Sequence, residues 1–229
     1  MSTQKKCTLL FLRAPERGRV KTRLAASLGD DAALKLYRFF VEDILGMLSR
    51  TGYPVILYGY PEDRLEDIAA WLGPDFPCRP QAGEDIGRKM ANAFSRAFSE
   101  GFEQVVLVGS DIPDLPPRII QNAFSALDHE GAALGPAVDG GYYLVAFQKS
   151  AFLPEVFENI SWSTEKVLTQ TLEKFKDAET PVRLLEPWQD VDTIEDLRAL
   201  SARNKADTSA APNTLGYLKK AGFKGSKER

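Results

Sequence analysis

Short apolar runs alternate along the chain with segments in which hydrophobic residues recur at helical spacing. The run VVLV at 105–108 is typical of a strand that is buried on both faces of a sheet. Similar runs predict strands at 7–12, 54–60, 104–109, 132–136, 142–147 and 181–185. Spacings of three and four predict helices at 22–28, 30–50, 62–71, 116–127, 164–176 and 190–200, one that opens within 79–88 and runs to 100, and a short helical segment at 151–159.

This alternation predicts an α/β fold in which a mainly parallel sheet is covered by helices on both faces. Only a few residues separate the strands at 132–136 and 142–147, so they form either a hairpin or two edge-related strands. No linker divides the chain, and we expect one domain over 1–204 with a polar, basic tail at 205–229. The tail is expected to be solvated or loosely docked, and a weak amphipathic turn around Leu215 and Leu218 offers a surface for packing.

Composition narrows the class of protein. The chain has 229 residues, of which 44% are hydrophobic and 27% charged, and its net charge of −3 gives no basic surface for nucleic acid. No apolar run reaches the roughly 18 residues of a membrane span, and the polar N-terminus does not resemble a signal peptide. Two cysteines are too few for a disulfide framework. These features predict a cytoplasmic enzyme-sized domain.

Asp111 follows the strand at 104–109. Ligands of open α/β sheets bind beyond the carboxyl ends of the strands, and a carboxylate there suits a divalent cation that carries phosphate oxygens. The alternative is that Asp111 only caps the following turn. Asp114 is expected to cap the helix at 116–127.

A basic loop follows the first strand, with five cations between Arg13 and Arg23. It is not a P-loop, because Val20 stands where the glycine before the lysine is required, and no GxGxxG fingerprint is present. Backbone N–H groups at the start of a helix, together with arginine and lysine side chains, can hold a diphosphate. The alternative is a solvated basic loop.

Three further segments carry candidate chemistry. The turn at 139–141 (DGG) brings backbone close to a ligand or is a plain hairpin turn, and spacing alone favours the plain turn. Asp190 or Asp192 supplies a second metal ligand or belongs to a helix cap, because Thr193 and Asp196 fit a capping box. Trp162 stacks on a sugar or base or, more often for such an aromatic, joins the core. The single histidine, His129, disfavours Ser–His–Asp catalysis.

Five blocks resemble a family in the same order along residues 7–200. They are 11–24 (FLRAPERGRVKTRL), 109–115 (GSDIPDL), 134–143 (LGPAVDGGYY), 162–164 (WST) and 190–193 (DVDT). The chain is therefore similar to a bacterial family of uncharacterised transferases within the nucleotide-diphospho-sugar transferase superfamily, which has the glycosyltransferase A fold. This resemblance implies a single-domain, Rossmann-like three-layer α/β/α sandwich with a mostly parallel mixed sheet.

The resemblance also implies roles for particular residues. Asp111 and Asp192 would hold Mg²⁺ or Mn²⁺, and Lys21, Asp111 and Asp139 would be catalytic. The nucleotide and its phosphates would lie on Arg13, Pro15, Gly18, Lys21, Thr22, Arg23, Gln81 and Gly83. The acceptor would lie on Asp139, Gly140, Gly141 and Trp162. One departure is that Asp111 stands without the Asp-x-Asp of many glycosyltransferases of this fold, so the second carboxylate must come from elsewhere.

We therefore expect a metal-dependent transferase that moves a sugar from a nucleotide-sugar donor to a small-molecule acceptor. One alternative is a nucleotidyltransferase that joins a nucleoside monophosphate to a phosphorylated small molecule, because a lysine near the α-phosphate occurs in related nucleotidyltransferases. Another is a nucleotide-binding module without turnover. The sequence leaves open the base, the sugar, the acceptor and the oligomeric state.

Overall fold

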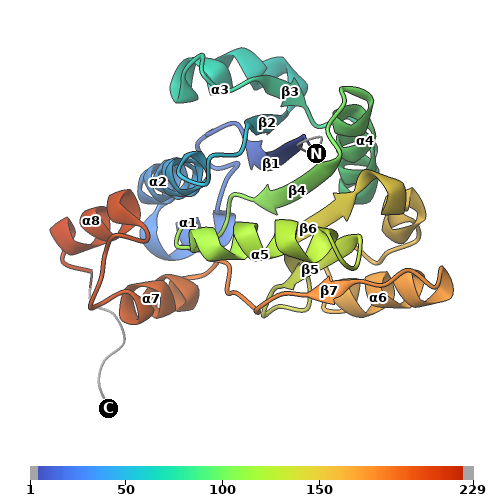
Figure 1. Ribbon diagram of the computed structural model, residues 1–229. Coiled ribbons are helices and arrows are strands. Elements are labelled where there is room, and N and C mark those ends of the chain that lie inside the picture. Colours follow the sequence, from blue (N-terminus) through green and yellow to red (C-terminus); the bar gives the residue numbers. More distant parts are fainter. Residues whose placement is uncertain (1–4, 224–229) are drawn as a thin grey trace.

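The strands form one sheet in the order β3-β2-β1-β4-β6-β5-β7 in the computed structural model, which describes residues 5–223 (Figure 1). Their bounds are β1 (Lys6–Arg13), β2 (Val55–Tyr60), β3 (Cys78–Pro80), β4 (Gln104–Gly109), β5 (Ala132–Pro136), β6 (Tyr142–Gln148) and β7 (Arg183–Leu184). Only β6 runs antiparallel to its neighbours, β4 and β5, and all other pairings are parallel. The predicted mixed, mostly parallel sheet is confirmed.

Helices cover both faces of this sheet. The α-helices are α1 (Thr22–Leu28), α2 (Asp30–Ser49), α3 (Leu65–Leu72), α4 (Ile86–Ser99), α5 (Pro117–Leu127), α6 (Val167–Asp177), α7 (Ile194–Arg203) and α8 (Pro212–Lys220). The short 3₁₀ helices are η1 (Glu62–Arg64), η2 (Lys149–Ala151) and η3 (Pro154–Phe157). The segment predicted as one short helix at 151–159 is instead covered in part by η2 and η3. The sequence did not predict β3, because three residues next to prolines show no periodicity.

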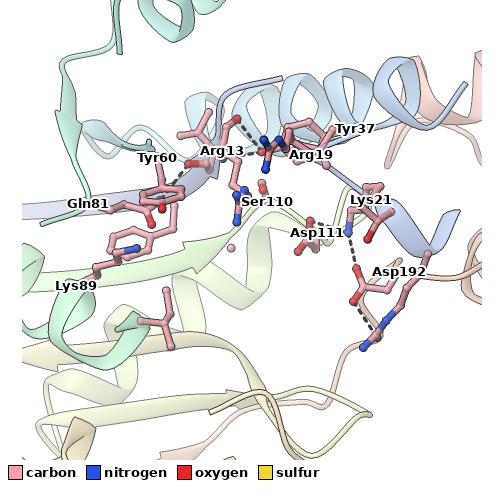
Figure 2. A pocket seen from close by; sticks show the side chains of 17 residues that line it. Arg13, Arg19, Lys21, Tyr37, Tyr60, Gln81, Lys89, Ser110, Asp111 and Asp192 are labelled. Carbon is pink, nitrogen blue, oxygen red and sulfur yellow. Dashed lines mark hydrogen bonds and ion pairs between the residues drawn. The ribbon is translucent and has the colours of Figure 1, made fainter. Parts of the chain in front are cut away.

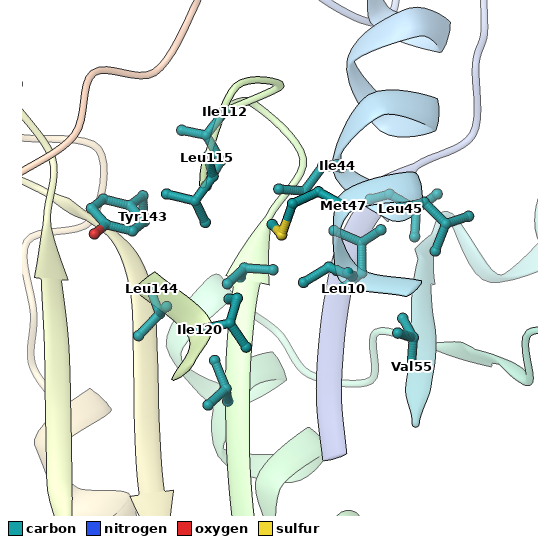
Figure 3. Packing of buried hydrophobic residues seen from close by; sticks show 14 of the residues in the cluster. Leu10, Ile44, Leu45, Met47, Val55, Ile112, Leu115, Ile120, Tyr143 and Leu144 are labelled. Carbon is teal, nitrogen blue, oxygen red and sulfur yellow. The ribbon is translucent and has the colours of Figure 1, made fainter. Parts of the chain in front are cut away.

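Alternate residues of the central strands build two cores. Leu10 and Leu12 of β1 face α2 and α5, whereas Leu9 and Phe11 face α4 and α6. Figure 3 shows the first of these cores, in which Ile44 of α2 points toward the sheet beside Leu10. Each fully buried aliphatic or aromatic side chain contributes about 1.5–3 kcal/mol. A strand buried on both faces thus fits the continuous apolar runs of the sequence.

The carboxyl ends of the parallel strands meet at one edge of the sheet. The segments after β1, β4 and β7 all leave from this edge because these strands are parallel. The connection between β5 and β6 lies there too, since these two strands form a hairpin. Neither strand of the hairpin is an outermost strand of the sheet, because β6 lies between β4 and β5, and β7 lies on the other side of β5. The basic loop, Asp111, the turn at 139–141 and the segment at 190–193 therefore lie at the same edge.

Helix α8 packs against α2 within the segment that the sequence assigned to a polar tail. Leu215 and Leu218 are buried against α2, α1 and α7. The buried carboxylate of Asp43 accepts hydrogen bonds from the backbone N–H groups of Asn213 and Thr214, both at 2.9 Å, and so satisfies the free amino end of α8. Residues 224–229, the basic end of that segment, lie outside the described residues.

No helix within residues 5–223 is long and apolar enough to cross a membrane.

Candidate functional site

The basic loop between β1 and α1 is anchored at its first residue by a tyrosine of α2. The backbone N–H of Arg13 donates to the Tyr37 hydroxyl at 2.7 Å, and that hydroxyl donates to the carbonyl oxygen of Arg13 at 3.0 Å. Burial is the main cause that raises the pKa of Tyr37, so the phenol keeps its proton. Tyr37 fits the core face that the sequence predicted, but it also holds the start of the loop.

Lys21 lies at the end of the loop, immediately before α1, and its ammonium group joins two distant carboxylates. Its Nζ is 2.7 Å from Oδ1 of Asp111 and 2.7 Å from Oδ1 of Asp192, and it donates to the carbonyl oxygen of Val191 (Figure 2). The side chain is only 4% exposed. Burial alone would lower the pKa of Lys21, but the two carboxylates outweigh it and raise that pKa, so the lysine stays charged.

Asp111 and Asp192 are brought together as the sequence required. The backbone N–H of Val191 donates to the carbonyl oxygen of Asp111 at 2.9 Å, which ties the two segments to each other. The capping box of α7 forms between Thr193 and Asp196, as predicted. Because Asp196 supplies the carboxylate of that box, the side chain of Asp192 is free to face the cavity. The carboxylate that caps α7 and the candidate metal ligand therefore belong to two different residues, Asp196 and Asp192.

These residues line a cavity of about 520 Å³, called here the first cavity. Figure 2 shows Lys21, Asp111 and Asp192 at one end of it and Tyr60, Gln81 and Lys89 at the other. The cations that line it are Arg13, Arg19, Lys21, Arg23 and Lys89. A cavity with five cations and two carboxylates suits a phosphorylated ligand that arrives with a divalent metal.

The far end of the first cavity is aromatic. Nζ of Lys89 lies 3.9 Å from the ring centroid of Tyr60, and the guanidinium of Arg13 lies 5.0 Å from the same centroid. The side-chain amide of Gln81 donates to the carbonyl oxygens of Leu12 and Tyr58, which fixes its place beside β1 and β2. A ring and an amide at this end can contact a base or a sugar.

The sequence-predicted nucleotide residues divide into two groups. Arg13, Lys21, Thr22, Arg23 and Gln81 line the first cavity, with Asp111 and Asp192. Pro15, Gly18 and Gly83 are not among its lining residues. A Cβ at Gly83 would lie 2.7 Å from the backbone nitrogen of Lys89, so this glycine lets the loop pass close to α4.

A second cavity of about 220 Å³ adjoins the first and shares Asp111 with it. Asp139, Gly141 and Asp190 line this second cavity. Burial, followed by the nearby charges of Asp192 and Asp139, raises the pKa of Asp190 to about 6. The carboxylates of Asp139 and Asp190 therefore face a smaller cavity, which lies beside the candidate metal ligand Asp111.

Two of the predicted acceptor residues line neither cavity. A Cβ at Gly140 would lie 2.4 Å from the carbonyl oxygen of Glu165, and its φ of 90° favours glycine, so it packs on the segment before α6. The ring of Trp162 packs edge-on against that of Tyr142, with centroids 6.3 Å apart. Trp162 is partly buried and packs against the core on the α4 side of the sheet, which matches the alternative that the sequence analysis favoured for it.

Asp114 is not the helix cap that the sequence predicted. Pro116 holds the position before α5, and the buried carboxylate of Asp114 accepts hydrogen bonds from Arg203, Asn204 and Trp188 instead. Burial alone would raise the pKa of Asp114, but the bonds and charge of Arg203 hold it below its usual value. Together, these three side chains satisfy more of the hydrogen-bonding capacity of the carboxylate than the N–H group at a helix cap would.

The residues present fit a divalent cation. One ammonium nitrogen lies 2.7 Å from an oxygen of Asp111 and 2.7 Å from an oxygen of Asp192, so the two carboxylates already face one shared cation. Among residues 5–223, no group of three or more His, Cys, Asp or Glu side chains is placed to hold a metal ion by itself. Mg²⁺ is commonly held by one or two carboxylates, with phosphate oxygens and water completing its shell. The pair therefore suits a metal that binds with a nucleotide.

Several lining residues were missed as site residues by the sequence analysis. They are Arg19, Tyr37, Tyr60, Lys89 and Ser110. Arg19 stands in the basic loop and Ser110 beside Asp111, so position alone could have indicated them. Tyr60 ends β2 at the same edge of the sheet, which was a usable signal. Lys89 lies within α4, and only the packing of that helix places it here.

Comparisons with known proteins identify the family and the fold of the chain. The profile of a family described as "Uncharacterized protein conserved in bacteria (DUF2064)" matches residues 45–164. A crystal structure from Desulfovibrio desulfuricans G20, provisionally named a nucleotide-diphospho-sugar transferase, is 40% identical, covers 96% of this chain and 97% of its own, and has a TM-score of 0.91. No curated protein sequence matches the chain.

Two more distant structures share the fold. The 4-diphosphocytidyl-2C-methyl-D-erythritol synthase from Anaerococcus prevotii DSM 20548 is 15% identical over 88% of this chain and 99% of its own, with a TM-score of 0.58. The protein Rv0371c from Mycobacterium tuberculosis H37Rv, in complex with manganese, is 17% identical over 86% and 98%, with a TM-score of 0.53. The fold class expected from the sequence is confirmed.

Proposed function

The chain belongs to the bacterial DUF2064 family within the nucleotide-diphospho-sugar transferase superfamily, and from there we propose that it is a metal-dependent transferase with a nucleotide-sugar donor. The 40% identity to a provisionally named nucleotide-diphospho-sugar transferase supports a transferase, and the donor, the metal and the acceptor are the proposal. The observation that carries it is the shared contact of Lys21 with Asp111 and Asp192 in a cavity lined by cations. The cytoplasmic location stays a prediction from the sequence.

The residues divide the work by position. Asp111 and Asp192 would hold Mg²⁺ or Mn²⁺, which when bound neutralises charge on the diphosphate. Lys21, Arg13 and Arg23 line the same space and stabilise the negative charge that develops on the leaving diphosphate. The manganese complex of the M. tuberculosis protein supports a divalent cation in this fold.

The transfer then balances as follows. The bond between the anomeric carbon of the sugar and the diphosphate oxygen breaks, and the nucleoside diphosphate leaves with that electron pair. A bond forms between the anomeric carbon and the acceptor oxygen, and the acceptor proton passes to the carboxylate of Asp139. Asp139 lines the second cavity, beside the first, and suits this role by position.

Nucleotidyl transfer is the second candidate, favoured by the similarity to the A. prevotii synthase and by the place of Lys21 at the phosphate end. It would release pyrophosphate from a nucleoside triphosphate. Glycosyl transfer would release a nucleoside diphosphate from a nucleotide sugar. The released product therefore separates the two reactions.

The test is a titration of the full chain with nucleoside diphosphates, nucleoside triphosphates and nucleotide sugars, with and without Mn²⁺. We expect Mn²⁺ to strengthen the binding of at least one nucleotide about tenfold or more, and Asp111→Asn to abolish that gain. Asp177→Asn is the matched control, because Asp177 is exposed at the end of α6 and lines neither cavity. If no nucleotide gains affinity from Mn²⁺ or Mg²⁺, the proposal is wrong.

A further inference from the structure

The two cavities differ sharply in charge. Five cations line the first cavity, whereas the lining of the second contains no lysine, arginine or histidine. The charged side chains of the second cavity are all carboxylates: Asp111, Asp139 and Asp190. Asp111 is paired with Lys21, but Asp139 and Asp190 still place negative charge on the second cavity, which therefore disfavours an anion at neutral pH.

The rest of the second cavity is apolar and aromatic. Phe11, Met90, Leu107, Tyr142, Tyr143 and Val145 are among its lining residues. Its volume of about 220 Å³ is smaller than a usual small-molecule site, so it takes a compact group. Burying a phosphate against such walls, with no cation to pair it, is strongly unfavourable.

A bound metal does not change this balance. The cation on Asp111 and Asp192 would be matched by the diphosphate of the donor, which the first cavity holds with its own cations. A second phosphate, on the acceptor, would still face Asp139 and Asp190. Opposite charge or neutrality is the complementary choice for the acceptor.

We propose that the second cavity takes an acceptor without phosphate: a neutral or cationic molecule whose hydroxyl or amino group faces Asp139 and whose apolar flank lies against the aromatic wall. This inference rests on the proposed transferase function, since it assigns the acceptor of the same site. It favours glycosyl transfer over the alternative that requires a phosphorylated small molecule.

The test uses three matched probes: cyclohexanol, cyclohexylamine and cyclohexyl phosphate. Each is titrated at pH 7.5 into the full chain with Mg²⁺, which is diamagnetic, and a nucleoside diphosphate present, and binding is followed by NMR. The backbone amide of Gly141 reports on the second cavity and that of Thr22 on the first, because each residue lines only its own cavity.

We expect cyclohexylamine and cyclohexanol to shift the Gly141 amide, with dissociation constants at least about tenfold lower than that of cyclohexyl phosphate. Asp139→Asn and, separately, Asp190→Asn should shrink the preference for the amine over the phosphate. Asp177→Asn should leave it unchanged. Using two separate variants guards against one that fails to fold.

Two results would overturn the inference. One is a Gly141 shift by cyclohexyl phosphate at equal or lower concentration than the amine. The other is the absence of any Gly141 shift with all three probes, because the cavity would then take no small acceptor. Failure of the nucleotide to shift the Thr22 amide, with the expected ranking at Gly141, would instead count against the proposed donor and leave the charge preference standing.

Discussion

Two ion-pair clusters join the segment after β4 to the C-terminal part of the chain, and they are built in opposite ways. In the first, a buried lysine lies between Asp111 and Asp192, whose side chains are 47% and 36% exposed. In the second, Asp114 is 1% exposed and its partner Arg203 is 27% exposed. The cation is the buried member of one cluster, and the anion is the buried member of the other.

The difference separates a replaceable contact from a fixed one. The carboxylates around Lys21 face a cavity, so under the proposed function a metal ion would reach them from that side. The carboxylate of Asp114 accepts bonds from Trp188, Arg203 and Asn204 and has no open side. Water screens exposed pairs and leaves them weak, whereas breaking a buried pair leaves a charge without compensation. We infer that the second cluster fixes the segment after β4 against α7, and that this keeps Asp111 and Asp192 in position near Lys21.

Asp114→Asn should have the largest effect on stability. The change removes the charge opposite Arg203 and should lower the free energy of unfolding by about 3 kcal/mol at pH 7. Urea unfolding of both proteins measures this loss. A change below about 0.5 kcal/mol would mean that the Asp114 cluster does not fix the segment after β4 against α7.

The pH dependence of this loss has a definite sign. Because the pKa of Asp114 is held below its usual value in the folded chain, its stabilisation is present above about pH 4 and is lost as the pH falls through the folded value. The difference between the native chain and Asp114→Asn should therefore narrow below pH 4. Unfolding curves at pH 7, 5 and 3.5 test this, and a gap that widens in acid would contradict it.

Lys21→Met should act on ligand binding more than on stability. Without the ammonium, Asp111 and Asp192 lose the cation that competes with a metal, so Mn²⁺ should bind about tenfold more tightly when no nucleotide is present. Nucleotide affinity should fall at the same time, because a phosphate-facing cation is lost. Calorimetric titration with Mn²⁺ alone measures the first effect, and weaker Mn²⁺ binding would show that Lys21 does not compete.

Tyr37→Phe should have the smallest effect. The change removes a neutral hydrogen bond between the hydroxyl and Arg13 while keeping the ring in the core, so stability should fall by about 1 kcal/mol. Nucleotide affinity should fall modestly, since the start of the basic loop loses its anchor. Thermal unfolding and nucleotide titration check the two effects. A loss of stability as large as that of Asp114→Asn would mean that the neutral hydrogen bonds of Tyr37 matter as much as the buried ion pair of Asp114.

The sequence predicted the layers and the edge of the sheet on which the site lies, because buried strands and helices have visible periodicities. It also brought Asp111 and Asp192 to one place, since both follow parallel strands. It did not predict that Lys21 would lie between them, because the contact depends on how α1 packs beside α7. The ion pair of Asp114, where the sequence predicted a helix cap, also depends on packing between distant segments. The position of Lys89 at the cavity does too. Contacts between distant segments leave no local pattern.

The bond between Lys21 and Asp192 spans 171 positions of the chain. Closing so long a loop costs conformational entropy that only the assembled sheet can offset. All seven strands that the structure describes precede Asp192 in the sequence, so a nascent chain contains every one of them before it contains both carboxylates that contact Lys21. The last part of the site to be synthesised is therefore one of its two carboxylates, and not a strand of the sheet that supports it.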